Sequence, residues 1–142
     1  MSPCGSVAKY IMNYRPLYLV LLILWSILIF NLSGIPNLSV GTQDWMARKL
    51  GHSFVYGILT FLLWKSIPWF ENNLSRKILL CAFIVLVYAI SDEIRQFFVP
   101  GRCGNIRGVL FDFFGAMAVL LLFWAKNVVS TKEELRSTDY TD

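Results

Sequence analysis

The chain has 142 residues, of which 56% are hydrophobic and 15% charged, with a mean hydropathy of +0.57 and a formal net charge of +4. An ordinary soluble domain of this length is less apolar, so the composition favours a single integral membrane domain. The basic residues lie in short segments between apolar runs, a pattern typical of membrane topology, which argues against nucleic-acid binding.

Four long apolar runs predict four transmembrane helices. Their bounds are Pro16–Leu32, Asp44–Ile67, Ile78–Phe98 and Arg107–Trp124. The first run is close to the roughly 20 residues that span a bilayer, whereas a secretory signal has a shorter apolar core. We therefore interpret it as an uncleaved first helix.

Glycine and proline separate the runs. These breaking residues are Gly34, Pro36 and Gly41 after the first run, Pro68 after the second, and Pro100 and Gly101 after the third. From Lys126 onward the chain is polar, which predicts a solvated tail that is partly helical or disordered. We expect an N-terminal segment at 1–15, a transmembrane domain at 16–126 and a polar tail at 127–142.

The predicted fold class is all-α, an integral membrane helical bundle of about four transmembrane helices. Short loops make sequence neighbours antiparallel. The larger set of basic residues then lies on the side of the two termini, at Lys9, Arg15, Lys65, Arg76, Lys77, Lys126, Lys132 and Arg136. Because the side richer in basic residues is usually cytoplasmic, we expect the N- and C-termini in the cytoplasm.

Polar groups that topology does not explain gather at the opposite membrane face. They are Arg48, Lys49, His52 and Tyr56 in the second run, Asp92, Glu93, Gln96 and Arg102 at and after the end of the third, and Arg107 and Asp112 in the fourth. Antiparallel packing brings these helix ends to one face, at similar depth. Ionisable groups against apolar segments cost several kcal/mol unless they are paired or hydrated, so they indicate a functional site.

Helical spacing predicts which of these side chains face one another. His52 and Tyr56 lie one and two turns after Arg48, and Gln96 lies one turn after Asp92. The candidate acids and bases are His52, Glu93 and Asp112. The candidate ligand-binding residues are Arg48, Lys49, Tyr56, Asp92, Gln96, Arg102 and Arg107. Simpler interpretations stay open: a buried ion-pair network that fixes helix register, a structural hydrogen bond for His52 and a packing role for Tyr56.

The sequence contains no familiar metal or nucleophile motif. Cys4, Cys81 and Cys103 form no CxxC or Cys/His cluster, and the single histidine excludes zinc patterns that need two. GxSxG, HExxH and glycine-rich phosphate loops are absent. We therefore expect no metal site and no cofactor, and whether the chain is an enzyme stays open.

Three pieces of the chain resemble the VanZ-like family of small bacterial membrane proteins. They are RKLGHSFVYG at 48–57, SDEIRQFFVPGR at 91–102 and VLFDFFGA at 109–116. The resemblance implies a multi-helix protein of the cell envelope; the family is named for a member associated with resistance to the antibiotic teicoplanin. By position, it implies functional candidates at Arg48, Lys49, His52, Tyr56, Glu93, Gln96, Arg102, Asp112 and Gly115. Gly108 stands where an acidic residue is expected, and Val55 where many members carry Glu.

The leading hypothesis is a multi-pass, non-transport protein of the bacterial inner (plasma) membrane. It would bind an anionic, lipid-linked cell-wall precursor or a glycopeptide in a polar outer-face pocket and lower sensitivity to teicoplanin. Arg102 and Arg107 would contact the anion, while Glu93 and Asp112 orient the arginines. One alternative is a membrane enzyme acting on an envelope lipid ester or phosphoester; another is a structural or assembly protein. Oligomeric state does not follow from the sequence.

Overall fold

The computed structural model describes residues 14–35, 43–67, 73–100 and 106–138; the side chains at 43–49, 134, 135, 137 and 138 fall outside this description. The described residues form four helices. They are α2 (Arg15–Ser33), α3 (Gln43–Ser66), α4 (Leu74–Phe97) and α5 (Ile106–Thr138). These ranges contain no strand, which confirms the predicted all-α bundle.

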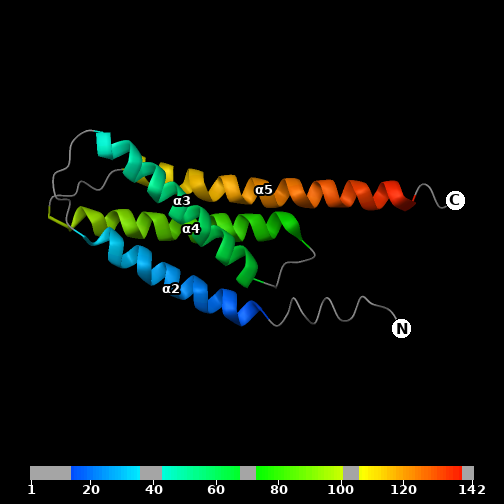
Figure 1. Cartoon of the computed structure of the whole chain (residues 1–142), viewed down its shortest axis with the longest axis horizontal. Coiled ribbons are helices and arrows are strands. Elements are labelled where there is room, and N and C mark those ends of the chain that lie inside the picture. Colours follow the sequence, from blue (N-terminus) through cyan, green and yellow to red (C-terminus); the bar gives the residue numbers. More distant parts are fainter. Residues whose placement is uncertain (1–13, 36–42, 68–72, 101–105, 139–142) are drawn as a thin grey trace.

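The helices alternate in direction along the chain (Figure 1). At one end of the bundle α2 and α4 terminate and α3 and α5 begin; we call this the site end. At the other end α2 and α4 begin and α3 terminates, and α5 continues past its neighbours. Because α3 and α5 run parallel, their first turns both lie at the site end beside the last turns of α4.

Local chemistry explains where the helices begin and end. Pro16 lies in the first turn of α2, where its missing N–H is not needed, and the N–H of Gly34 bonds back to the last carbonyls. At the start of α4 the side chain of Asn73 accepts a hydrogen bond from the backbone N–H of Arg76 at 3.1 Å. Pro100 follows the C-cap of α4 at Phe98.

Helix α5 is longer than predicted, because it continues beyond Trp124 to Thr138. The residues after Trp124 include no Gly or Pro, and several of them are good helix formers. Asn127 and Thr131 each donate a side-chain hydrogen bond to the carbonyl four residues back, at 2.9 and 3.0 Å. The polar tail is therefore helical as far as Thr138.

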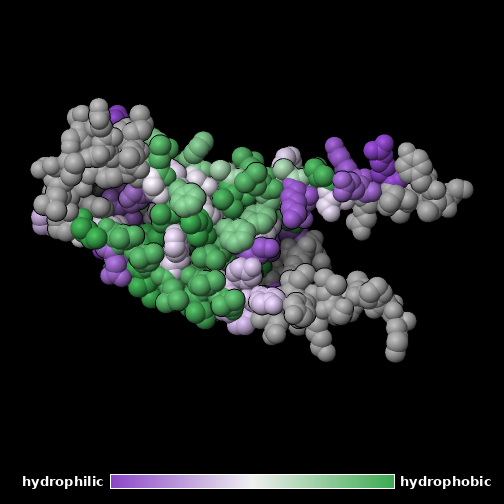
Figure 2. Space-filling view, in the orientation of Figure 1, coloured by the Kyte–Doolittle hydropathy of each residue, from purple (hydrophilic) through white to green (hydrophobic). Residues whose placement is uncertain are grey.

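Three of the described helical segments are long and apolar enough to cross a membrane: Arg15–Ser33, Leu74–Phe97 and Ile106–Glu133. Helix α3 is not one of them, since polar residues occupy its first turns before the apolar stretch from Phe54 to Trp64. Within the described residues, three of the four predicted transmembrane helices therefore meet this criterion. The surface over the bundle is largely apolar, and hydrophilic residues gather on the far end of α5 (Figure 2). Large exposed side chains of α2 include Leu17, Ile23 and Phe30, as a lipid-facing surface requires.

Helix α3 packs most closely against α5, through glycine. Gly115 of α5 lies directly against the backbone of Ser53, so that a Cβ atom at position 115 would overlap the Ser53 carbonyl group. The Ser53 hydroxyl also donates a hydrogen bond to the carbonyl oxygen of Phe111 at 2.7 Å. Small residues allow helix backbones to approach in this way in membranes. Gly115, a functional candidate by resemblance, therefore has a packing role here.

We expect Gly115→Ala to lower the thermal unfolding midpoint of the detergent-purified protein. The added methyl group must push α3 and α5 apart, and overpacking of this kind costs roughly 1–3 kcal/mol. Gly51→Ala is the matched control, because a Cβ atom at position 51 meets nothing within 4 Å and alanine is the better helix former. Equal midpoints for the two variants would contradict this packing.

Candidate functional site

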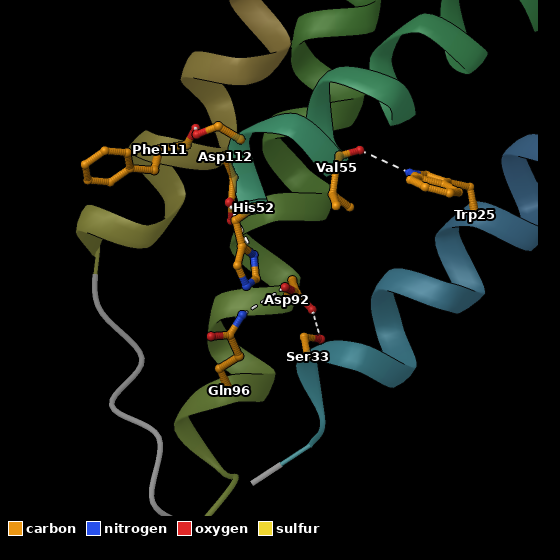
Figure 3. Close-up of polar contacts among 9 residues, drawn as sticks. Trp25, Ser33, His52, Val55, Asp92, Gln96, Phe111 and Asp112 are labelled. Atoms are coloured by element: carbon orange, nitrogen blue, oxygen red, sulfur yellow. Dashed lines mark hydrogen bonds and ion pairs between the residues drawn. The ribbon is translucent and has the colours of Figure 1, made fainter. Parts of the chain in front are cut away.

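Three helices bring His52, Asp92 and Asp112 together at the site end. One ligand atom from each residue lies within 4.8 Å of the other two. Figure 3 shows the imidazole of His52 between the two carboxyl groups. Asp92 and Asp112 are buried, at 4% and 1% exposure, whereas the His52 side chain is 29% exposed. The sequence predicted this convergence; we call these three residues the acidic cluster.

Asp92 is held by hydrogen bonds from two helices. The hydroxyl of Ser33, at the end of α2, donates to Asp92 Oδ1, and Gln96 Nε2, one turn along α4, donates to Oδ2 at 2.9 Å. Arg95 in turn donates to Ser33 Oγ at 3.3 Å and to the carbonyl oxygen of Phe30. These contacts fix the orientation of the Asp92 carboxylate and fasten the end of α2 to α4 (Figure 3).

Asp112, on the other side of the cluster, is less completely hydrogen-bonded than Asp92. Asp112 Oδ1 lies 3.5 Å from His52 Nδ1, within ion-pair range, yet this oxygen has no hydrogen-bond partner among the described residues. The hydroxyl of Tyr56, one turn after His52 on α3, is fully buried and also lacks a partner in the described part of the chain. Buried polar groups are normally hydrogen-bonded, so two such oxygens at one site call for an explanation.

Two ionised carboxylates as close together as those of Asp92 and Asp112 would be costly. Two unit negative charges 4.8 Å apart repel by roughly 3 kcal/mol at an effective dielectric constant of about 20, and by more where the surroundings are drier. His52 can offset one charge when it is protonated. The cluster therefore favours whatever brings positive charge to it, whether a proton, a metal ion or a cationic group.

Glu93 occupies a different place from Asp92. It is buried, at 7% exposure, and its carboxylate lies against Gly108 in the first turn of α5. A Cβ atom at position 108 would lie 2.5 Å from Glu93 Oε1 and 2.6 Å from Oε2. Glu93 thus fills the space that a side chain at position 108 would need, which explains how this chain carries glycine where the family resemblance predicts an acidic residue.

The remaining predicted site residues are those beside the cluster, one that is exposed at the same end, and those whose side chains fall outside the described residues. Tyr56 and Gln96 adjoin the cluster, and Arg107 is exposed in the first turn of α5 at the same end. Arg48 and Lys49 lie in α3, but their side chains fall outside the described residues. The predicted position of Arg102 beside the carboxylates also falls outside them. The described interior of the site is therefore acidic.

Sequence reasoning missed two residues that shape the site. Ser33 lies one residue beyond the predicted first helix at Pro16–Leu32, but it completes α2 and donates to Asp92. Arg95 is not among the predicted site residues, but it supports Ser33 and lies 3.7 Å from the centre of the Phe30 ring. Both contacts join α2 to α4 across some 60 positions of sequence, and helical periodicity carries no signal for them.

Val55, the second departure from the family pattern, also has a structural context. Its carbonyl oxygen accepts a hydrogen bond from Trp25 Nε1 of α2 at 3.0 Å, and its half-buried side chain packs against the hydrophobic core (Figure 3). The interaction uses the backbone at this position and leaves the residue type free. It fastens the middle of α2 to α3.

An apolar groove adjoins the cluster along the surface between α3 and α5. Its volume is about 440 Å³. It is lined by Ser53, Phe54, Gly57, Ile58, Phe61, Phe114, Gly115, Ala118 and Val119. Ser53 follows His52 directly, and Gly115 lies one turn after Asp112. The groove therefore lies on two of the helices that carry the acidic cluster and runs along them away from the site end, although none of the three cluster residues lines it.

Comparison with known families decides the assignment. The family model described as VanZ/LLP1 matches residues 5–128, which is most of the chain. The chain belongs to the VanZ/LLP1 family. No curated protein and no solved structure matches it. Together with the apolar helices, membership makes this a VanZ-like membrane protein, as the three sequence pieces predicted.

The fit between Glu93 and Gly108 gives a test specific to this VanZ-like chain. We expect Gly108→Ala to destabilise the protein by roughly 1 kcal/mol or more, since the buried carboxylate must leave its present position. In a Glu93→Ala background the same change should be neutral or stabilising, because alanine is the better helix former. A double-mutant cycle measured by thermal unfolding in detergent gives the coupling. Purely additive effects would contradict the contact.

Proposed function

We propose that this VanZ-like protein binds an anionic amphiphile of the bacterial envelope, a lipid-linked cell-wall component or a lipoglycopeptide, at the site end. The observation that carries the proposal is that an apolar groove and a polar cluster lie about one turn apart on the same two helices, α3 and α5. His52 and Ser53 are neighbours on α3, and one serves the cluster while the other lines the groove. An amphiphile likewise joins a polar head group, which would lie at the cluster, to an apolar chain, which would lie in the groove.

The groove suits a hydrocarbon chain. Its walls are almost entirely apolar, and Phe54 and Phe114, at 69% and 72% exposure, stand at its rim. Gly57, Gly115 and Ala118 leave its floor free of bulky side chains. A chain that leaves the bilayer here exchanges one apolar environment for another, so the groove supplies shape and the polar cluster supplies selectivity for the head group.

The head group would meet both signs of charge. Arg107 is exposed at the site end, and Arg48, Lys49 and Arg102 are close to this end in sequence. In this proposal the arginines contact phosphate or carboxylate, and Glu93 and Asp112 orient them. The larger set of basic residues at the opposite end favours an outer-face location for the site, with both termini in the cytoplasm of a bacterial cell.

A second candidate function rests on the His52–Asp112 pair. A histidine whose Nδ1 faces a buried carboxylate 3.5 Å away has the arrangement of an oriented general base. On an ester or phosphoester of an envelope lipid, His52 would activate water and Asp112 would stabilise the imidazolium that forms. This membrane-enzyme reading uses the same site and the same groove.

Binding can be tested with a polyprenyl phosphate and the uncharged polyprenol of equal chain length. We expect the purified protein in nanodiscs to prefer the phosphate by about tenfold or more, since a charge-assisted contact contributes about 1.5–3 kcal/mol. Ala118→Trp fills the groove and should abolish binding of both. Leu122→Trp is the control, because Leu122 is 71% exposed on α5 and does not line the groove. Equal binding by the two Trp variants would refute the proposal that the groove holds the polyprenyl chain.

Cells give the complementary test. In a teicoplanin-sensitive host we expect the wild-type protein to raise the inhibitory concentration of teicoplanin, and Glu93→Gln to lose the effect, because a neutral amide no longer orients an arginine. His52→Ala with mass spectrometry of lipid extracts separates the two candidate functions: a lipid change that this variant abolishes supports the enzyme. Identical sensitivity of host, wild type and Glu93→Gln would refute the resistance role.

A further inference from the structure

We propose that His52, Asp92 and Asp112 bind one divalent transition-metal ion, of the Zn²⁺ or Mn²⁺ class. The first argument is charge. When both buried carboxyl groups are ionised, the cluster holds two negative charges, which one divalent ion would cancel. Buried charges in proteins are normally paired or coordinate metals.

The geometry suits a single ion. Zinc bonds of about 2.0–2.2 Å to nitrogen and oxygen place neighbouring tetrahedral ligand atoms roughly 3.4 Å apart. His52 Nδ1 and Asp112 Oδ1 are 3.5 Å apart without a hydrogen bond between them, which is the spacing of two atoms that share an ion. All three ligand atoms lie within 4.8 Å, so small side-chain rotations close the set.

Unpartnered oxygens point independently to a ligand at this place. Asp112 is 1% exposed and its Oδ1 accepts no hydrogen bond in the described part of the chain. Tyr56, which is not one of the three proposed ligands, is fully buried, and its hydroxyl likewise has no partner among the described residues. Tyr56 lies one turn after His52 on the same helix, α3. A bound ion and its water would satisfy both oxygens.

Hydrogen bonds orient one of the proposed ligands, and a partly exposed side chain leaves the site accessible to an ion. The Ser33 and Gln96 side chains donate to Asp92 from outside the cluster, as the partners of metal-binding carboxylates do. The His52 side chain is 29% exposed, so an ion has a route to the two buried carboxylates. One nitrogen and two oxygens form a mixed donor set, and imidazole favours a transition metal over Mg²⁺ or Ca²⁺, which prefer oxygen alone.

This inference revises the expectation of no metal, which came from a single histidine and no cysteine cluster. The sequence places the two carboxylates at the same membrane face as His52, but only the structure gives the distances between their ligand atoms. The inference deepens the proposed function, because an ion here gives an acidic pocket the positive charge that an anionic head group needs. It does not rest on that function, since it is tested with the metal alone and no lipid.

The test is metal binding by the full chain purified in detergent, stripped with a chelator and titrated calorimetrically with Zn²⁺ and with Mn²⁺. We expect one ion per chain for at least one metal, confirmed by elemental analysis after dialysis, and an unfolding midpoint that rises with the metal. Asp112→Asn and His52→Ala should each weaken binding by about 100-fold or more, beyond the roughly 10–100-fold loss typical of a merely orienting partner.

Two further variants make the result decisive. Glu133→Gln removes an exposed carboxylate far along α5 and should bind as the wild type does. Tyr56→Phe removes an unsatisfied hydroxyl, so it should keep the fold while weakening binding by about tenfold. No bound ion in the wild type would overturn the proposal and would mean that protons alone neutralise the cluster. Metal binding that is unchanged in Asp112→Asn and His52→Ala would also overturn the proposal, because the bound metal would then be an adventitious ion only.

Discussion

Asp92 and Asp112 place two carboxyl groups in the interior of a membrane bundle, and the site end is built around accommodating them. Ser33 and Gln96 donate to Asp92, Arg95 supports Ser33, and His52 faces Asp112. These residues come from α2, α3, α4 and α5, so the same interactions that stabilise the charges also join the helices. Polar contacts suit this task in lipid, where the hydrophobic effect does not drive helices together and association depends on packing and interhelical hydrogen bonds.

Glycine decides how closely these helices approach. Gly115 lets α5 touch the backbone of Ser53, which holds Asp112 at the level of His52. Gly108 leaves space for the Glu93 carboxylate on α4. The acidic residue expected at position 108 and Glu93 in its present position exclude each other sterically. Glu93 of α4 therefore presents its carboxylate to α5 at that level, and Asp112 is the buried acid that α5 contributes to the site end.

The two ends of the bundle differ in the chemistry of their side chains. The site end combines buried acids, an imidazole and exposed Arg107, and an apolar groove lies about one turn further along α3 and α5. The other end is closed by aromatic packing, where Trp64 stacks on Phe123 at 4.7 Å and Lys77 lies 4.6 Å from the Trp64 ring centre. An amphiphile with its head at the site end and its chain along α3 and α5 matches this polarity, and a cation in the acidic cluster would join the two requirements.

The sequence by itself determined the all-α membrane class, the helix bounds of α2, α3 and α4 to within a few residues, the family, and the convergence of His52, Asp92 and Asp112. Those features follow from hydropathy, from breakers such as Pro68 and Pro100, and from the alternation of antiparallel helices. Only the tertiary structure decided that Ser33 and Arg95 serve Asp92, that Glu93 fills the space at Gly108, and that one oxygen each of Tyr56 and Asp112 has no hydrogen-bond partner among the described residues. The reason is physical: periodicity fixes which face of a helix a residue occupies, whereas helix rotation and separation fix which atoms meet.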